Sequence, residues 1–277
     1  PQLADFIVVF NNFRNHFPTG YIGRVPAMDP DVNDRLNYRF LSGNEASILN
    51  LNPSTGYIQL DSRLNSDVPT NATLQVSVSD GINEVKATCR LYVRLVTQEM
   101  LFNSITIRLQ GISQEAFLSP LYQRFTSALA SVIPTSEDNV FIINVQDDTD
   151  VTEPILNVSF SVRKTVQNNR DVFYPQQFLR ERVYLQRILL AKLSTLQVLP
   201  FDDNMCLREP CLNYEDCVSI LQFGNASSVI SSPTMLFRPI HPINAVSCKC
   251  PSGFTGRNEV YLCDIEVNLC YSSPCLN

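Results

Sequence analysis

The stretch that decides the class of this chain is Cys248-Lys249-Cys250-Pro251-Ser252-Gly253-Phe254-Thr255-Gly256. It completes the pattern C-x4-C-x5-C-x30-C-x-C-x12-C, whose cysteines are Cys206, Cys211, Cys217, Cys248, Cys250 and Cys263. Cysteines this dense usually form disulfides, which persist only in oxidising compartments. Zinc binding is the rival interpretation, but this region offers only His241 and no paired CxxC motifs. The pattern therefore predicts a small extracellular module stabilised by disulfides.

Composition narrows the class further. The chain has 277 residues, room for two or three small domains, and a formal net charge of −6. An acidic chain with 21 Lys and Arg residues does not favour a nucleic-acid-binding protein, which needs a clustered basic face. Three N-glycosylation sequons agree with secretion, and they begin at Asn71, Asn157 and Asn225.

Residues 1–97 predict a β-sandwich of short strands. Phe6–Phe10 is a β-branched and aromatic run, and apolar residues alternate with polar ones over 74–78 and 85–95. Period-two alternation is typical of a strand buried on one face. Cys89 lies on the apolar side of its strand, so we expect a structural, buried thiol there.

Three motifs in this first segment carry a resemblance. Asp29-Pro30-Asp31, Thr55-Gly56-Tyr57-Ile58-Gln59-Leu60 and Asp80-Gly81 occur in the order found in a cadherin repeat, which this segment resembles. The resemblance implies that Asp29, Asp31 and Asp80 are calcium ligands. Oxygen ligands of this kind suit Ca²⁺.

The segment also departs from that family. Asn11-Asn12 stands where a cadherin repeat has a glutamate, and Leu64-Asn65-Ser66-Asp67 stands where it has L-D-R-E. Fewer carboxylates weaken a calcium site. Two interpretations of the aspartates therefore remain open, a weak or partial calcium site and caps of turns. Because no acidic linker follows residue 97, we expect this repeat to be the last of its array.

Residues 98–202 predict strands and helices in the order βαββαβ, an α+β ferredoxin-like pattern. Helices are expected over about 117–133, with Ser119 as an N-cap and Pro120 in the first turn, and over 175–193, where apolar residues give a broad stripe. Strands are expected at 104–109, 141–145, 155–162 and 196–199. This segment resembles the SEA and membrane-adjacent domains that follow some cadherin arrays. Many SEA domains cleave themselves at a serine in the middle turn, but here that turn, 146–154, contains neither glycine nor serine. Self-cleavage is therefore not expected. The acidic turn itself is read as an exposed loop rather than a calcium site.

Residues 203–264 resemble an EGF-like module with an unusually long third loop. That resemblance implies the disulfides Cys206–Cys217, Cys211–Cys248 and Cys250–Cys263. Cys270 and Cys275 repeat the opening spacing within 265–277, as a second, truncated EGF-like unit. We therefore expect the chain to be a piece of a longer ectodomain.

The succession of segments resembles one receptor family over the whole chain. Val198-Leu199-Pro200-Phe201-Asp202-Asp203-Asn204 and Leu236-Phe237-Arg238-Pro239-Ile240-His241-Pro242 look like the Flamingo/Celsr family, the cadherin, EGF and laminin-G seven-pass receptors of the adhesion class. The resemblance implies a place on the extracellular side of the plasma membrane, calcium-dependent homophilic cell–cell adhesion, and planar cell polarity signalling. Partners would be the same receptor on a neighbouring cell, through distal repeats outside this chain, and other polarity proteins. Membrane attachment would likewise lie outside this chain.

Two other functions are alternatives to this one. Catalysis needs an activated nucleophile, a positioned acid or base, or a metal, and neither His16 nor His241 has such a motif beside it. We therefore expect a non-enzymatic segment that acts mainly as a structural spacer. The alternative is a direct cis or trans adhesion module of another cadherin/EGF single-span receptor.

Overall fold

The computed structural model describes residues 1–13, 21–31, 34–63, 68–167, 170–201, 206, 211, 216–250, 254–257 and 260–266. The chain forms two compact units. The first contains Pro1–Phe201 and Phe223–Pro242, and the second contains Asp202–Gln222 and Ile243–Asn277. Residues 223–242 come from the predicted third loop of the disulfide module, yet they fold with the first unit. No described helix is long and apolar enough to cross a membrane.

The first part of the first unit is a β-sandwich, as the sequence predicts. One sheet has the strand order β14-β15-β1-β7-β6-β3 and the other has the order β2-β5-β4. Their bounds are β1 Phe6–Asn12, β2 Tyr21–Arg24, β3 Asn37–Ser42, β4 Leu49–Leu51, β5 Tyr57–Leu60, β6 Thr70–Ser79, β7 Glu84–Leu95, β14 Ile230–Ser232 and β15 Met235–Arg238. The last two strands come from the loop, so the larger sheet combines segments more than 130 residues apart in sequence.

The predicted alternation of β6 and β7 is confirmed. Leu74, Val76 and Val78 on β6, and Cys89, Leu91 and Val93 on β7, are at most 1% exposed. They form the sandwich core together with Phe6, Val8 and Phe10 of β1. Cys89 lies opposite Leu74 and is free, as expected for a small buried hydrophobe.

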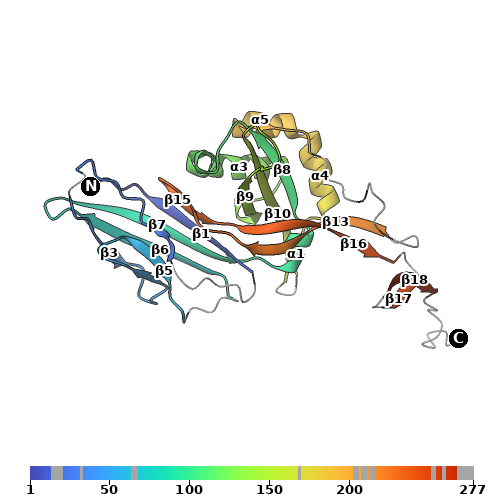
Figure 1. Ribbon diagram of the computed structural model, residues 1–277, viewed down its shortest axis with the longest axis horizontal. Helices are drawn as coiled ribbons and strands as arrows, with labels where there is room; N and C mark the ends of the chain where they lie inside the picture. The colour runs from blue at the N-terminus through green and yellow to red at the C-terminus, as the bar shows by residue number, and fades with distance from the viewer. Residues whose placement is uncertain are drawn as a thin grey trace. The chain divides into compact units, whose positions relative to one another are not determined.

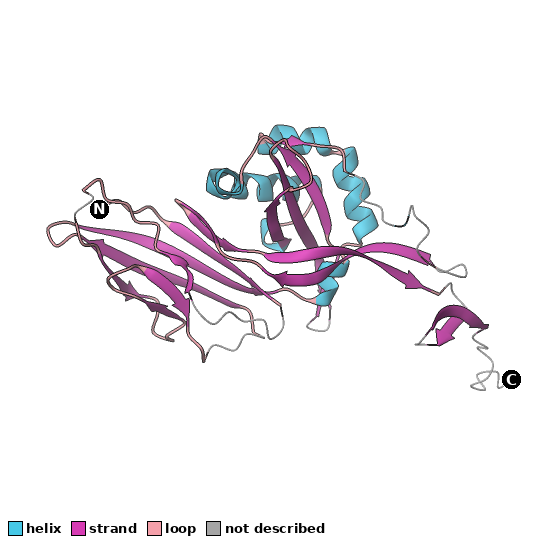
Figure 2. Cartoon of the chain, in the orientation of Figure 1, coloured by secondary structure: helices cyan, strands magenta, loops and turns pink. Residues whose placement is uncertain are grey.

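The second part of the first unit is an antiparallel sheet covered by helices (Figure 2). Its strands are β8 Ile105–Gln110, β9 Val140–Asp147, β10 Ile155–Gln167, β11 Arg170–Phe173 and β12 Gln197–Val198. The order is β11-β10-β8-β12, and β9 also pairs with β10. The helices are α1 Gln98–Phe102, α2 Gln114–Ala116, η1 Phe117–Leu121, α3 Tyr122–Val132, η2 Glu137–Asn139, α4 Gln176–Leu185 and α5 Arg187–Ser194.

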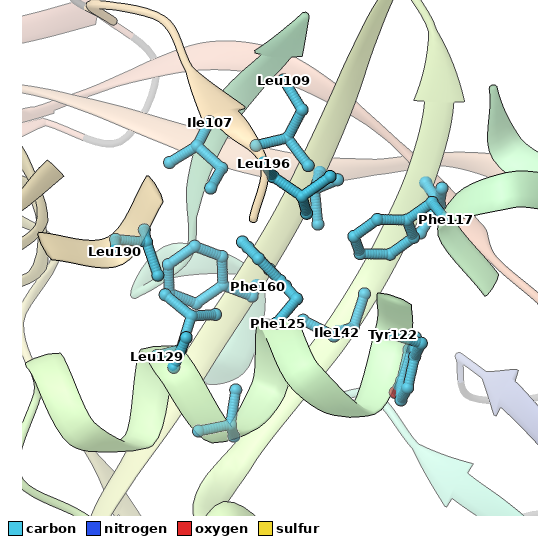
Figure 3. Close-up of a cluster of buried hydrophobic side chains, with 14 of the residues drawn as sticks. Ile107, Leu109, Phe117, Tyr122, Phe125, Leu129, Ile142, Phe160, Leu190 and Leu196 are labelled. Carbon is cyan, nitrogen blue, oxygen red and sulfur yellow. The ribbon is translucent and has the colours of Figure 1, made fainter. Parts of the chain in front are cut away.

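The core of this second part lies between the sheet and its helices. Figure 3 shows Phe125 and Leu129 of α3 facing Ile142 and Phe160 of the sheet. All four are buried completely. Phe117 packs edge-on against Phe125, with ring centroids 5.4 Å apart. A continuous apolar cluster of this kind supplies most of the stability of such a layer.

Both predicted helices differ from expectation. The first begins its regular part only at Tyr122, and Ser119 is extended, with φ −142° and ψ 111°. Proline disfavours the helical conformation in the residue before it, which explains this start. The second is broken at Gln186 into α4 and α5. The predicted apolar stripe is therefore interrupted, and Leu185 and Ile188 are 76% and 77% exposed.

Burial of Cys89 has a consequence that can be measured. It raises the pKa of the thiol from its ordinary value of 9.0 to about 12. The folded thiol keeps its proton where the unfolded thiol loses it, so the free energy of unfolding should fall as pH rises from 9 to about 12. The slope contributed by this thiol is at most about 1.4 kcal/mol per pH unit. Urea unfolding across this range would measure it.

The matched control is Cys89→Ala, in which the same experiment reports every other titrating group. The difference in slope between the two proteins isolates the thiol. Equal slopes, or rapid labelling of Cys89 by a thiol reagent in the folded protein at pH 8, would contradict the assignment of a buried, protonated cysteine.

Candidate functional site

The first feature of interest is the strand β15, which the disulfide-module loop adds to the sandwich (Figure 1). It pairs in parallel with β1, with Ile7 opposite Met235 and Val9 opposite Phe237. The amide of Ile7 also donates to the carbonyl of Thr234 at 2.9 Å. The edge of β1 that would otherwise be open is therefore covered by another part of the same chain.

Both faces of β15 are buried. Leu236 belongs to the sandwich core, whereas Met235 and Phe237 belong to the core of the helix-covered sheet. Side chains alternate across a strand, so one short strand reaches both cores. The ring of Phe237 lies 6.0 Å from that of Tyr122 on α3, and the hydroxyls of Thr234 and Ser119 are 2.6 Å apart. The strand β15 thus joins the two parts of the first unit.

Arg238 is the last residue of β15, and its charged side chain is buried. Its guanidinium carbon lies 4.5 Å from the centre of the Phe10 ring, and its Nη1 donates to the carbonyl of Asn11 at 3.4 Å. The residue is 5% exposed, and burial lowers the pKa of the guanidinium to about 10. Even so, it remains charged at neutral pH, held by the aromatic face and the carbonyl.

The side chain of Asn11 also joins the sandwich to the helix-covered sheet. Its Nδ2 donates to the carbonyls of Ile142 and Ile143 on β9, each at 3.1 Å. The side chain is almost fully buried, so an amide that donates two hydrogen bonds suits this position, whereas a carboxylate cannot donate. The departure from the cadherin pattern at Asn11 therefore has a structural role, which no sequence signal revealed.

A second feature is an acidic cluster at one end of the sandwich. One carboxylate oxygen from each of Asp29, Asp34 and Asp80 lies within 4.8 Å of the others. The predicted set was Asp29, Asp31 and Asp80. Asp31 contributes its backbone amide, which donates to Oδ1 of Asp29 at 3.0 Å, while its side chain is not in the cluster among the residues described. Sequence reasoning missed Asp34, although it follows the D-x-D motif by three residues.

Asp80 caps a turn as well as belonging to this cluster. Its Oδ1 accepts hydrogen bonds from the amides of Ile82, at 2.7 Å, and Asn83, at 2.6 Å. Chiefly through these bonds, the pKa of Asp80 falls to about 2. The carboxylate is thus charged throughout the physiological range.

A positive group already lies among these carboxylates. The Pro1 ammonium nitrogen is 3.0 Å from Oδ2 of Asp29 and 3.6 Å from Oδ2 of Asp80. The Asp29 carboxylate raises the pKa of this amine, and the pKa of Asp29 is lowered, first by the amide of Asp31 and then by the amine. Carboxylate oxygens gathered in this way fit a hard metal ion such as Ca²⁺.

The three sequons differ in accessibility. Asn71 on β6 is exposed, and so is Asn225 on the strand β13, Asp216–Ala226. Asn157 is half-buried in β10, between β8 and β9. The serine of its sequon, Ser159, is 1% exposed and shares a hydrogen bond with Thr106 at 2.8 Å.

The second unit contains the cysteines of the predicted disulfide module. Disulfides join Cys206 to Cys217 and Cys211 to Cys248. Cys250 is also disulfide-bonded. The side chain of Cys263, and all of Cys270 and Cys275, lie outside the described residues, as do His16 and 64–67. The described strands here include β16 Ile240–Lys249, which pairs with β13, and the pair β17 Phe254–Arg257 and β18 Val260–Glu266.

Solved structures of cadherin domains resemble parts of this chain. Human protocadherin-24 EC1-2, form II, is 25% identical over 36% of this chain and 43% of that chain, with a TM-score of 0.26. The third cadherin domain of human protocadherin 7 is 21% identical over 32% of this chain and 82% of that chain, with a TM-score of 0.28. TM-scores this low carry no argument about arrangement.

Comparison of sequences is more informative. Residues 1–92 match a family model described as CELSR2-like, ninth cadherin domain. The chain is 58% identical, over its full length, to 8% of the Drosophila melanogaster protocadherin-like wing polarity protein stan. It is 52% identical over 99% of its length to 9% of mouse cadherin EGF LAG seven-pass G-type receptor 1, and 48% identical over 99% to 13% of rat receptor 2. The chain thus spans only about a tenth of the relatives it matches, and as a segment of that size it belongs to the Flamingo/Celsr family of cadherin receptors.

Proposed function

We propose that this chain is a non-enzymatic extracellular segment of an adhesion receptor and acts mainly as a structural spacer. The observation that carries the proposal is β15, whose residues belong to both cores of the first unit. Met235, Leu236 and Phe237 are at most 2% exposed, and burying each contributes roughly 1.5–3 kcal/mol. Two domains joined in this way transmit force and orientation as one body, whereas a flexible linker does not.

The proposal includes a domain assignment. We assign 1–97 to a last cadherin repeat, 98–202 to a ferredoxin-like or SEA-like membrane-adjacent domain, 203–264 to an EGF-like unit and 265–277 to the start of another. The antiparallel order β9-β10-β8-β12, with helices after the first and third of these strands in sequence, supports the middle assignment. The two disulfides support the third. In this arrangement the EGF-like unit is tied to the repeat through its own third loop.

At the level of the whole receptor, we propose calcium-dependent homophilic cell–cell adhesion and planar cell polarity signalling at the plasma membrane. Support comes from relatives whose names include wing polarity and seven-pass receptor. Recognition of the same receptor on a neighbouring cell would use distal repeats outside this chain, and other polarity proteins would be further partners. The present segment would hold those repeats away from the membrane.

Calcium is the proposed cofactor of the acidic cluster. Asp29, Asp34 and Asp80 would bind the ion, which would hold the end of the sandwich by cross-linking the D-x-D loop and the β6–β7 turn. Three carboxylates are a small set, so affinity should lie near the weak extracellular range, about 10⁻⁴–10⁻³ M.

One observation favours the alternative, a direct adhesion module. Leu185 and Ile188, at the junction of α4 and α5, are both more than three-quarters exposed, and Leu189 and Leu193 on α5 are 43% and 42% exposed. Exposed apolar residues close together on a surface often mark a protein contact. Self-association is the property that separates the two functions.

Removal of the Phe237 ring tests the spacer. In Phe237→Ala, the free energy of unfolding should fall by about 3–5 kcal/mol, because a ring buried between two cores is lost. Amide hydrogen exchange should also accelerate on β1, whose Ile7 amide bonds to Thr234. Ile82→Ala, at a side chain 92% exposed, is the control and should change stability by less than about 0.5 kcal/mol. Unchanged exchange on β1 in Phe237→Ala would contradict the coupling.

Sedimentation tests the alternative. A spacer should sediment as a monomer at micromolar concentration in analytical ultracentrifugation. A micromolar dimer that dissociates in Leu185→Ser/Ile188→Ser would instead establish direct adhesion through the α4–α5 face. Val68→Ser, which is 52% exposed on the sandwich, is a matched control for lost apolar surface.

Calorimetric measurement of stability tests the proposed calcium site. With a dissociation constant near 1 mM, 10 mM Ca²⁺ should stabilise the chain by about 1.4 kcal/mol, and Asp29→Asn should abolish this gain. Asp150→Asn, in the acidic turn of the other sheet, should leave the gain unchanged. A calcium response that survives Asp29→Asn and Asp80→Asn would refute this site.

A further inference from the structure

A cavity lies where the outer face of the sandwich sheet meets the helix-covered sheet. Its volume is about 540 Å³, and its lining includes Asn71 and Tyr92 from the sandwich and Phe141 and Arg163 from the other sheet. Arg94 of β7 also lines it. Nothing in the proposed spacer or calcium functions uses this cavity.

The cavity has a sequon at its lining. Asn71 lies directly opposite Tyr92 across the β6–β7 ladder, so the two side chains share one face of the sheet. Val9 on the neighbouring strand, opposite Tyr92, is in the core of the helix-covered sheet, which identifies this face as the one turned toward the second sheet. A glycan attached to the side chain of Asn71 would therefore begin at the lining of the cavity.

The walls combine aromatic rings with hydrogen-bond donors. The guanidinium carbon of Arg94 is 5.7 Å from the Tyr92 ring centre and 5.8 Å from that of Phe141. Its Nη1 is buried and has no hydrogen-bond partner among the described residues. Arg163, by contrast, already donates to Asn139 at 3.0 Å and to Asp171 at 3.2 Å. Arg94 thus brings a guanidinium to the lining of the cavity, and one of its buried donors has no acceptor among the described residues.

We propose that Asn71 carries an N-linked glycan whose first N-acetylglucosamine occupies this cavity. The apolar face of the sugar ring packs on Tyr92 and Phe141, and an acetamide or hydroxyl oxygen accepts a hydrogen bond from the Arg94 guanidinium. A saccharide suits these walls because it offers both apolar ring surface and many neutral acceptors. The glycan then fills the space between the two sheets that β15 already joins.

Attachment occurs before the chain folds and needs a lipid-linked oligosaccharide diphosphate as donor. The Asn71 amide nitrogen bonds to C1 of the sugar and loses one proton. The C1–O bond to the diphosphate breaks, and the lipid diphosphate leaves with the electron pair. The inference requires the extracellular route that the proposed function implies.

The other sequons provide internal comparisons. Asn225 is exposed and does not line the cavity, so its glycan should be freely accessible. Asn157 is half-buried between two neighbouring strands, so a glycan there would obstruct folding, and chains that fold should be unmodified at this site. Of the three sequon asparagines, only Asn71 is both exposed and part of the lining of this cavity.

Native deglycosylation is the test. The full chain is secreted from animal cells and digested with a peptide N-glycosidase, which must reach the innermost sugar, and each site is followed by mass spectrometry. The glycan on Asn71 should be released at least about tenfold more slowly than that on Asn225 in the folded protein, and equally fast after denaturation. Equal rates in the folded protein would overturn the inference.

Variants distinguish the effect of the glycan on stability from the effect of the Asn71 side chain itself. Asn71→Gln and Thr73→Ala remove the same glycan by different changes, and both should lower Tm by about 2–4 °C relative to the glycosylated chain. Asn225→Gln should not. Arg94→Ala should speed release from Asn71 toward the Asn225 rate, and an unchanged rate would overturn the role of Arg94.

The outcomes also distinguish this inference from the proposed function. A glycan on Asn225 with none on Asn71 would overturn the inference and leave the extracellular location intact. No glycan on either asparagine would overturn the inference and also remove the support that the sequons give to an extracellular location.

Discussion

The parallel pairing of β15 with β1 is the constraint on which the first unit depends. A strand buried on both faces must have apolar side chains pointing both ways, and Met235-Leu236-Phe237 provides them. Leu236 completes the sandwich, and its two neighbours complete the core beneath α3. Without this strand the edge of β1 would present unpaired amides and carbonyls, and each core would lack part of one wall.

The long loop that delivers β15 comes from the disulfide module, and the disulfides make this insertion less costly. Cys211 and Cys248 are joined across 37 positions of sequence, which bracket the whole of β14 and β15. Cross-linking the ends of a long segment removes much of the entropy that its ordering would otherwise cost. The loop is thus a structural element of the first unit, and its length, unusual for such a module, is what lets it reach β1.

Asn11 stands where a cadherin repeat has a glutamate, and it too contributes to the junction between the two sheets. At this position an acid could help to hold a metal, but the amide instead donates to two carbonyls of β9. The chain therefore has fewer carboxylates than the cadherin pattern and a firmer junction between its two sheets. The acidic cluster that remains lies on the D-x-D loop and the β6–β7 turn, where Asp80 is held by its own turn.

Local pattern predicted much of this protein. Alternation over β6 and β7 located the sandwich core, including the buried Cys89, and the cysteine spacing located the disulfide module. Predictions from local sequence pattern failed where contacts with other residues decide the conformation. The stripe over 175–193 was broken at Gln186, and the helix expected to start at Ser119 begins its regular part only at Tyr122. Asp34 joined the acidic cluster because the loop folds back, which spacing alone does not encode.

The sequence by itself determined the strands, the family and the class of chemistry, because these depend on side-chain periodicity and on motifs a few residues long. Only the tertiary structure decided where the long loop lies, what Asn11 donates to, and which sequon opens onto a cavity. Those properties arise from residues as far apart as 11 and 238, or 71 and 163, which meet only when both cores have formed. Contacts over such separations are set by the packing of whole elements, and no local pattern records them.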